Sequence, residues 1–288
     1  MTGIFEYIVL MLLVSFIAGL IGALVGVGGG ILVVPALTLL FGIPIQYAIG
    51  ASIVSVIATS SGSAAAYVRD HITNLRIGMF LEIGSSCGAI VGAVASISLV
   101  RSGYSWVVFL TFGAMLIVSA YSSAVRLRKE RKKGSEIINQ KQNKVSERLR
   151  LSGEYYDGAT KKTVGYVADR VYPAFGVMFV AGVLSALLGV GGGILKVVGL
   201  DSYMKLPFKV STTTSNFMIG VTAAASTTIY YIGGFVNPIL AAPVAIGVLI
   251  GAFAGTKVLV RTKPGALRWL FVAVLIIIAI EMVHEGLP

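Results

Sequence analysis

Residue types that build disulfides, metal sites and acid–base centres are scarce in this 288-residue chain. It has one cysteine, Cys87, and two histidines, His71 and His284, which lie at the ends of apolar segments. A single cysteine excludes a disulfide framework and a cysteine-based metal cluster. The apolar segments hold no cluster of metal ligands and no nucleophile with an evident base partner. We therefore expect no metal, no cofactor and no enzymatic activity.

Charge is also scarce, because only 12% of the residues are charged whereas 56% are hydrophobic and the mean hydropathy is +0.90. A soluble domain of this length could not bury so much apolar surface, so the composition predicts a membrane protein in contact with lipid. The net charge of +11 is concentrated in the gaps between apolar runs. This pattern is typical of the positive-inside rule and not of nucleic-acid binding. Residues 1–20 have neither a positively charged start nor a clear cleavage site, so we interpret them as a retained membrane segment.

The apolar stretches form two groups of four. We expect a first membrane repeat over 1–125, a basic cytoplasmic linker over 126–172 and a second repeat over 173–288. The offset of 163 residues that brings Gly26 onto Gly189 also aligns residues in all the later segments. The aligned pairs include Gly19 with Gly182, Pro44 with Pro207, Ser52 with Ser215, Thr59 with Thr222, Asn74 with Asn237, Gly88 with Gly251 and Trp106 with Trp269. An ungapped register of this length indicates internal duplication, which is common in secondary transporters.

The basic residues indicate that the two copies are inverted. With four crossings in each half, the copies would be parallel, and seven basic residues would lie outside. If the first segment of each half enters the membrane and returns, only Arg101 lies outside and the linker is cytoplasmic. Residues 31–42 could form about 18 Å of helix, which reaches about the midplane of a hydrocarbon core roughly 30 Å thick. We therefore predict an all-α polytopic membrane protein with two inverted homologous repeats. Each repeat has a Gly-rich broken or re-entrant first segment followed by three transmembrane helices, and both termini lie outside.

The Gly-rich breaks at 26–30 and 189–193 are the candidate substrate site. Each precedes a short helix, starting near Ile31 and near Ile194, whose first turn has free N–H groups and a partial positive charge. Two such ends that converge near the midplane would suit a small oxyanion. The hydroxyl-rich segments that follow would approach the same point, and Lys196 lies three residues after the second break. The predicted substrate-binding residues are Gly28, Gly29, Gly30, Ser52, Gly191, Gly192, Gly193, Lys196, Thr214, Ser215 and Asn216.

Each of these residues also has a structural interpretation. The glycines could serve helix packing, and the hydroxyls could bond to backbone carbonyls or neighbouring helices. Lys196 could extend to the cytoplasmic face or pair with Asp201. Glu82 is expected near the cytoplasmic interface, close to Arg76, with a coupling-proton role as the alternative.

Two further patterns are interpreted as structural. The ridge of Gly84, Gly88 and Gly92, with its counterpart Gly247, Gly251 and Gly255, is expected to pack helices closely. The linker is expected to be a solvated connector with a short helix near 135–150, and a regulatory role is the alternative.

The chain resembles the TauE/SafE sulfite exporter family, also called the DUF81-type or TSUP permeases. The resemblance lies in GALVGVGGGILVVPAL at 22–37, GIPIQYAIGAS at 42–52, LLGVGGGILKVV at 187–198 and LPFKVSTTTSNFMIGVTAAAS at 206–226. It implies transport of sulfite, an organosulfonate or a related sulfur-containing or carboxylate anion. The membrane would be the cytoplasmic membrane of a bacterium or archaeon.

The expected function is thus a secondary transporter of a small anion, with export as the expected direction. The alternatives are a passive anion channel and a membrane-embedded enzyme or sensor. Coupling to a proton or sodium gradient is compatible with this expectation, but no residue pattern identifies the ion. The expected partners are the anion and membrane lipid, without nucleic acid, and the sequence does not indicate an oligomeric state.

Overall fold

The computed structural model describes residues 2–25, 29–69, 72–130, 146, 149, 151–157, 162–259 and 264–287. Helices dominate the described part of the chain. In the first half they are α1 (Thr2–Val25), α2 (Gly30–Pro35), the π-helical η1 (Ala36–Leu40), α3 (Ile45–Arg69), α4 (Leu75–Arg101) and α5 (Ser105–Glu130). In the second half they are α7 (Val171–Leu188), α8 (Gly193–Val198), η2 (Gly199–Tyr203), α9 (Phe208–Ile232), α10 (Pro238–Leu259) and α11 (Pro264–Gly286).

The order of elements is the same in both halves, including a short helix after each Gly-rich break. In the second half, α7 ends at Leu188, and Gly189, Gly191 and Gly192 then adopt positive φ angles of 69°, 77° and 66°. Glycine adopts this left-handed conformation without strain, which explains its repetition here. In the first half, α1 ends at Val25 and α2 begins at Gly30. The predicted short helices are confirmed, whereas residues 26–28 lie outside the described residues.

The first helix of each half packs on the other half. α1 lies along α10, and α7 lies along α4. A Cβ atom added to Gly251 would be 2.0 Å from the carbonyl oxygen of Phe16, and one added to Gly88 would be 2.1 Å from that of Phe179. Both contacts are related by the repeat offset, and at both the helix backbones touch. The predicted packing role of these glycine ridges is confirmed.

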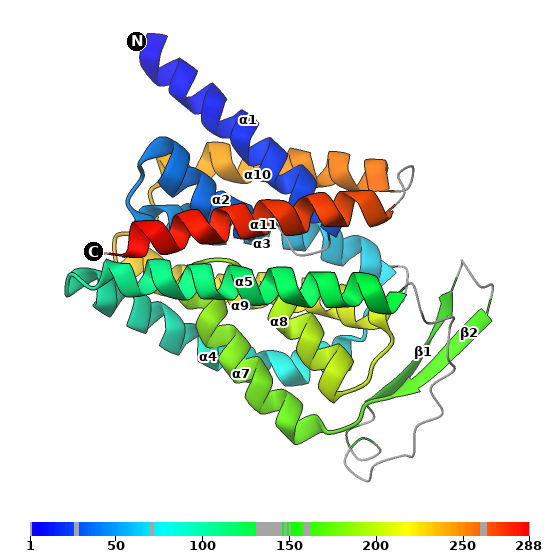
Figure 1. Ribbon diagram of the computed structural model, residues 1–288. Helices are drawn as coiled ribbons and strands as arrows, with labels where there is room; N and C mark the ends of the chain where they lie inside the picture. Colours follow the sequence, from blue (N-terminus) through cyan, green and yellow to red (C-terminus); the bar gives the residue numbers. More distant parts are fainter. Residues whose placement is uncertain are drawn as a thin grey trace.

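The equivalent helices α5 and α11 pack together and run in opposite directions (Figure 1). Gly286 near the end of α11 lies against Phe109 and Leu110 near the start of α5, whereas Gly113 lies against Ala279 and Val283. The central helices α3 and α9 also contact each other. Each pair relates one half to the other, so the interface between the halves is built from matching elements.

The outer helices present large apolar side chains at the surface, as lipid-facing helices do. Their exposed apolar residues include Leu13, Ile17, Ile83, Ile90, Val94, Ile117, Val180, Ile246, Ile250, Phe253, Ile277 and Ile280. Three described helices are long and apolar enough to cross a membrane, over Leu75–Arg101, Val171–Leu188 and Pro238–Gly255. Shorter apolar helices lie at Glu6–Gly22, Gly30–Leu40, Ile45–Ser61 and Ser105–Tyr121.

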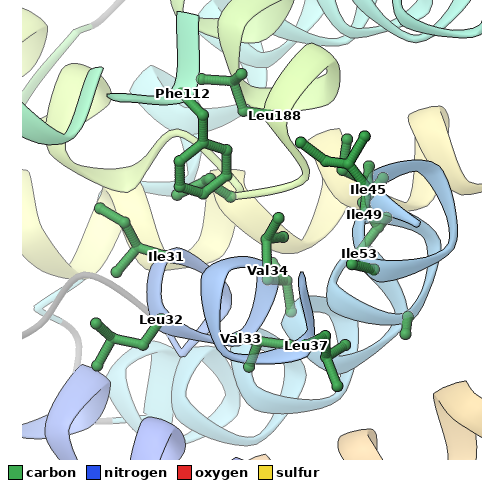
Figure 2. Packing of buried hydrophobic residues seen from close by; sticks show 14 of the residues in the cluster. Ile31, Leu32, Val33, Val34, Leu37, Ile45, Ile49, Ile53, Phe112 and Leu188 are labelled. Atoms are coloured by element: carbon green, nitrogen blue, oxygen red, sulfur yellow. The ribbon is translucent and has the colours of Figure 1, made fainter. Parts of the chain in front are cut away.

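The half-helix α2 is buried on all sides, which fixes the position of the first break. Figure 2 shows Ile31 and Val34 of α2 near Phe112 of α5, and Ile49 of α3 packs in the same cluster. Every residue from Gly30 to Pro35 is buried. A six-residue helix cannot be stable alone, so this packing holds it in place.

The linker contains an element that the sequence did not lead us to expect. β1 (Ser152–Asp157) and β2 (Lys162–Val167) form an antiparallel hairpin. Tyr155 and Tyr166 are buried in a cluster with Ile77 and Leu81 of α4. The all-α prediction and the solvated-connector prediction are wrong for this segment, because these aromatic side chains bury apolar area. The helix expected at 135–150 lies outside the described residues, except for Ser146 and Leu149.

The hairpin is docked at the end of the molecule opposite to the two termini (Figure 1). The side-chain amide of Asn74, which also caps α4, donates to the Tyr166 hydroxyl at 3.0 Å. Burial raises the pKa of Tyr166, so this hydroxyl stays protonated well above neutral pH. Lys205, after η2, pairs with Asp169 at 3.3 Å. The linker is thereby attached to both halves.

Gly251→Ala and Gly88→Ala are each expected to lower the free energy of unfolding by about 1–3 kcal/mol, because the added methyl group meets a neighbouring backbone. Thermal unfolding in detergent measures the loss. The matched control is Gly176→Ala on α7, where nothing lies within 4 Å of the new methyl group. The control is expected to keep or slightly raise the melting temperature. Equal melting temperatures for Gly251→Ala and Gly176→Ala would contradict the close contact.

Candidate functional site

The two Gly-rich breaks meet at Ser52 of α3. Its buried hydroxyl donates to the carbonyl oxygen of Gly189 at 2.8 Å and lies 3.2 Å from that of Gly30. A Cβ atom added to Gly30 would be only 3.2 Å from the Gly189 carbonyl oxygen. Two segments that are far apart in the sequence are thus joined inside the molecule. The predicted convergence of the breaks is confirmed for Gly30 and Gly189, and Gly28 lies outside the described residues.

Ser215 repeats the arrangement in the second half. Its hydroxyl donates to the Gly193 carbonyl oxygen at 3.1 Å, as the hydroxyl of Ser52 contacts that of Gly30. Each serine has a single hydroxyl proton, and in both it is directed to backbone carbonyl oxygens at the breaks. Both serines therefore hold the broken backbone, which is the structural interpretation offered above for the hydroxyls.

The remaining predicted residues take different places around the breaks. Gly191 and Gly192 are buried, and a Cβ atom there would meet Ile219 at 2.6 Å and Ser185 at 2.8 Å. The Thr214 hydroxyl accepts from the backbone N–H of Asn74 at 3.2 Å. Thr214 thus faces the start of α4 and not the breaks.

Asn216 lies on α9, one residue after Ser215, and its side chain is half-buried. Its backbone carbonyl accepts a hydrogen bond from the Ser60 hydroxyl of α3. The predicted residues of α9 therefore serve three different contacts, with a break, with α4 and with α3.

Lys196 lies in α8, immediately after the second break, and its side chain is 0% exposed. Its ammonium donates to the Met218 carbonyl oxygen at 3.1 Å and to the Thr222 hydroxyl, both on α9. Its Nζ atom is also 3.5 Å from Oε2 of Glu82 on α4. The ammonium therefore does not extend to the surface, and its acidic partner is Glu82 instead of Asp201. Both structural interpretations offered for Lys196 are wrong.

Glu82 is the other half of this buried pair. It was expected near the cytoplasmic interface close to Arg76, and that depth in the membrane stays a prediction. The structure shows that Glu82 is only 5% exposed and faces Lys196, whereas Arg76 is exposed. Its Oε1 accepts from Ser86 at 2.8 Å and from Thr222. Its Oε2 has no hydrogen-bond partner. Glu82 was not among the predicted site residues, although its position as the one acid well inside a first-half apolar segment was a usable signal.

Thr222 and Ser85 complete the polar cluster, and the sequence analysis missed both as site residues. Their hydroxyls lie 3.0 Å apart, and both side chains are 0% exposed. Thr222 contacts both members of the ion pair, so it links α4, α8 and α9. The sequence shows that Thr222 has an equivalent in the first half, Thr59. It does not show that Lys196 and Glu82 lie beside Thr222, and these charges give Thr222 its role.

The ion pair has no counterpart in the other half. The repeat offset places Val33 opposite Lys196 and Ala245 opposite Glu82. Val33 is buried in the apolar cluster around α2. The two equivalent positions thus hold apolar side chains in one half and a pair of charges in the other.

A separate pocket of about 380 Å³ lies at the end of the bundle near the C-terminus. It is lined by residues of η1, the start of α3, α5 and α11, including Thr38, Gln46, Ser105 and Glu285. None of the predicted site residues lines it. Among the described residues, no group of three His, Cys, Asp or Glu side chains comes together in a way that could hold a metal ion.

The sequence profile of the family described as Sulfite exporter TauE/SafE matches residues 11–282. The chain belongs to the TauE/SafE family. Within this family, it is 28% identical to the "Probable membrane transporter protein YunE" of Bacillus subtilis (strain 168), over 97% of this chain and 98% of the relative.

Two other relatives support the same assignment. The "Probable membrane transporter protein YdhB" of Bacillus subtilis is 28% identical over 86% of this chain and 89% of its own length. The "Probable membrane transporter protein MJ0441" of Methanocaldococcus jannaschii is 25% identical over 96% of this chain and 97% of its own length. No solved structure matches this TauE/SafE protein. Its family and its relatives indicate a membrane transporter.

Ser52→Ala is expected to lower the free energy of unfolding by about 1–3 kcal/mol, because it leaves the buried Gly189 carbonyl without its donor. Ser61→Ala is the matched control on the same helix. The Ser61 hydroxyl is exposed and donates only within α3, to the Ile57 carbonyl oxygen. Thermal unfolding of both variants in detergent measures the difference. A Ser52→Ala protein as stable as the Ser61→Ala protein would show that the junction of the breaks does not depend on this hydroxyl.

Proposed function

We propose that this protein is a secondary transporter that carries a small anion across the cytoplasmic membrane of a prokaryote. The cargo is sulfite, an organosulfonate or a related sulfur-containing or carboxylate anion, and the family description makes export the expected direction. The observation that carries the proposal is the wholly buried Lys196, which lies three residues after the second break. An ionisable side chain within a membrane segment is costly, and it is found mainly where a substrate or ion passes.

The chemistry of this region suits an oxyanion. The Lys196 ammonium has three N–H donors, and sulfite and sulfonate groups present three acceptor oxygens. Unwound glycine backbone lets a ligand approach closely, and hydroxyl groups surround the breaks. In this proposal, the anion contacts Lys196 and the backbone of Gly28–Gly30 and Gly191–Gly193. Ser52, Ser215 and Asn216 border the same path, and Ser52 and Ser215 also hold the breaks. Thr214 faces the start of α4 and is not a contact of the anion in this proposal.

The proposal includes two inverted repeats and alternating access between them. The reciprocal packing of α1 on α10 and of α7 on α4 supports this arrangement, as does the opposite direction of α5 and α11. Repeats related in this way can rock against each other, so that the central site opens first to one side and then to the other. The basic linker favours a cytoplasmic position for the hairpin and an outside position for both termini.

Anion uptake into proteoliposomes tests the function. The assay uses labelled sulfite, thiosulfate, sulfate, sulfoacetate and acetate. Lys196→Ala is expected to slow transport of the accepted anion about tenfold or more, which corresponds to about 1.4 kcal/mol of lost interaction. Lys209→Ala removes an exposed lysine at the start of α9 and serves as the control. Ser215→Ala is expected to slow transport through the loss of the contact with Gly193.

Two outcomes would count against this assignment. Unchanged transport by Lys196→Ala and Ser215→Ala would remove both residues from the site. A current far above the turnover of a carrier, measured under voltage clamp, would indicate a passive anion channel.

Cysteine labelling tests the topology. In a Cys87→Ala background, Glu154→Cys places a thiol on the exposed face of the hairpin, and Glu285→Cys places one near the C-terminus. A membrane-impermeant maleimide is expected to label Glu285→Cys in intact cells and Glu154→Cys only in inside-out vesicles. Labelling of both thiols from the same side would rule out the inverted topology.

A further inference from the structure

The buried pair of Lys196 and Glu82 is not required by the architecture. Val33 and Ala245 take the equivalent positions in the other half, and both are apolar. Moving two charges out of water is unfavourable, and well-packed apolar side chains of similar volume are often at least as stable. The pair therefore calls for an explanation other than fold stability.

The two members of the pair are held unequally. The Lys196 ammonium is anchored on α9 by the Met218 carbonyl oxygen, and by the Thr222 hydroxyl that also contacts Glu82. The Glu82 carboxylate is anchored through Oε1, whereas Oε2 faces the ammonium at 3.5 Å and has no hydrogen bond. An anion could thus take the place of Oε2 beside the ammonium without displacing Lys196 from its own anchors.

The charge balance at this point restricts what can bind. With Glu82 ionised, the pair is neutral, and an added anion would leave a net negative charge in a region of low dielectric. With Glu82 protonated, the anion and the ammonium form the neutral pair instead. Binding of one negative charge is therefore favourable only together with one proton.

We propose that Glu82 is the proton-binding residue of a proton-coupled anion site at Lys196, which rests on the anion transport proposed above. One proton from water on the side of entry forms an O–H bond on the Glu82 carboxylate, and the anion replaces that carboxylate beside the Lys196 ammonium. Release on the other side returns both the proton and the anion to water. One proton moves with each negative charge, so the cycle transfers no net charge.

The surroundings of Glu82 are consistent with a single coupled proton. Lys196 of α8 is the charged group that faces it among the described residues, and α9 contributes the Thr222 hydroxyl. On α4 itself, Ser86 contacts the carboxylate. Where α7 packs on the adjacent turns of α4, it contributes apolar contacts, including Phe175 against Gly84.

This coupling has a consequence for direction. A proton gradient directed into the cell favours uptake of the anion. Export then requires an inside-to-outside anion ratio that exceeds the proton ratio. The same site serves both directions, and the two gradients decide between them.

The test uses the full-length protein in proteoliposomes with the membrane potential held at zero by valinomycin and equal potassium. The probe is labelled 2-hydroxyethanesulfonate, whose sulfonate keeps one negative charge at every pH used. With the outside one pH unit more acidic, the wild-type protein is expected to accumulate the probe about tenfold, equal to the proton ratio. A trapped pH dye is expected to report acidification of the interior during uptake.

Glu82→Gln is expected to reduce the accumulation ratio to about one at any pH gradient while exchange of internal for external probe stays measurable. Glu82→Asp keeps a titratable carboxyl group and is expected to retain accumulation. Glu281→Gln removes an exposed carboxylate of α11. As the matched control, it is expected to keep the wild-type accumulation ratio.

Thermal stabilisation by the probe gives a second readout. In the wild-type protein, the rise in melting temperature on adding the probe is expected to grow as the pH falls. In Glu82→Gln, this rise is expected to be independent of pH.

The outcomes separate the two proposals. Accumulation by Glu82→Gln equal to the proton ratio would overturn the role of Glu82 and leave anion transport intact. Accumulation by the wild-type protein that is independent of the pH gradient would overturn the coupling without any variant. Absence of uptake and exchange of every anion tested in the wild type would instead overturn the transport function itself.

Discussion

The constraint on which the rest of the structure depends is that unwound backbone inside a hydrocarbon layer must find hydrogen-bond partners within the protein. Two Gly-rich breaks create that demand, and Ser52 and Ser215 meet part of it from the next helix of each half. The apolar cluster around α2 and α3 excludes solvent from the first break. Close glycine contacts between α1 and α10, and between α4 and α7, then bring the two halves near enough for the breaks to adjoin.

On this symmetric framework, the polar cluster of Lys196, Glu82, Thr222 and Ser85 is one-sided. The duplicated parts explain much of how the chain folds, because contacts such as Gly88 on Phe179 have an equivalent in Gly251 on Phe16. The unduplicated charges distinguish the two breaks chemically. In the proposed transport cycle, the framework that changes conformation and the site that recognises the cargo are built from different residues.

Much of this organisation could be predicted from the sequence. The ungapped register of glycines, prolines and serines revealed the repeat, and the short helices after the breaks followed from their length. The glycine ridges were correctly assigned to packing, because four-residue spacing places small residues on one helix face. Periodic and repeated features of this kind are local, so the chain alone reveals them.

The polar cluster could not be predicted in the same way. Whether Lys196 meets Glu82 or Asp201 depends on how α8 lies against α4, and no local pattern encodes that packing. Glu82 was associated with Arg76 because the two residues are close in the chain, but Glu82 is buried beside Lys196 whereas Arg76 is exposed. The hairpin was missed because the linker is polar on average, and only Tyr155 and Tyr166 reveal that one of its faces is buried.

The reciprocal packing also bears on how the protein is made. α1 is synthesised first, yet its principal partner, α10, is among the last helices to leave the ribosome. Until then, Gly19 lacks its close partner Val248 of α10, and the main contacts of α1 within its own half are with the short α2 and η1. Neither half is therefore a self-sufficient folding unit, and the two must mature together in the bilayer. A duplication that began as two separate chains would have met the same requirement as an obligate dimer.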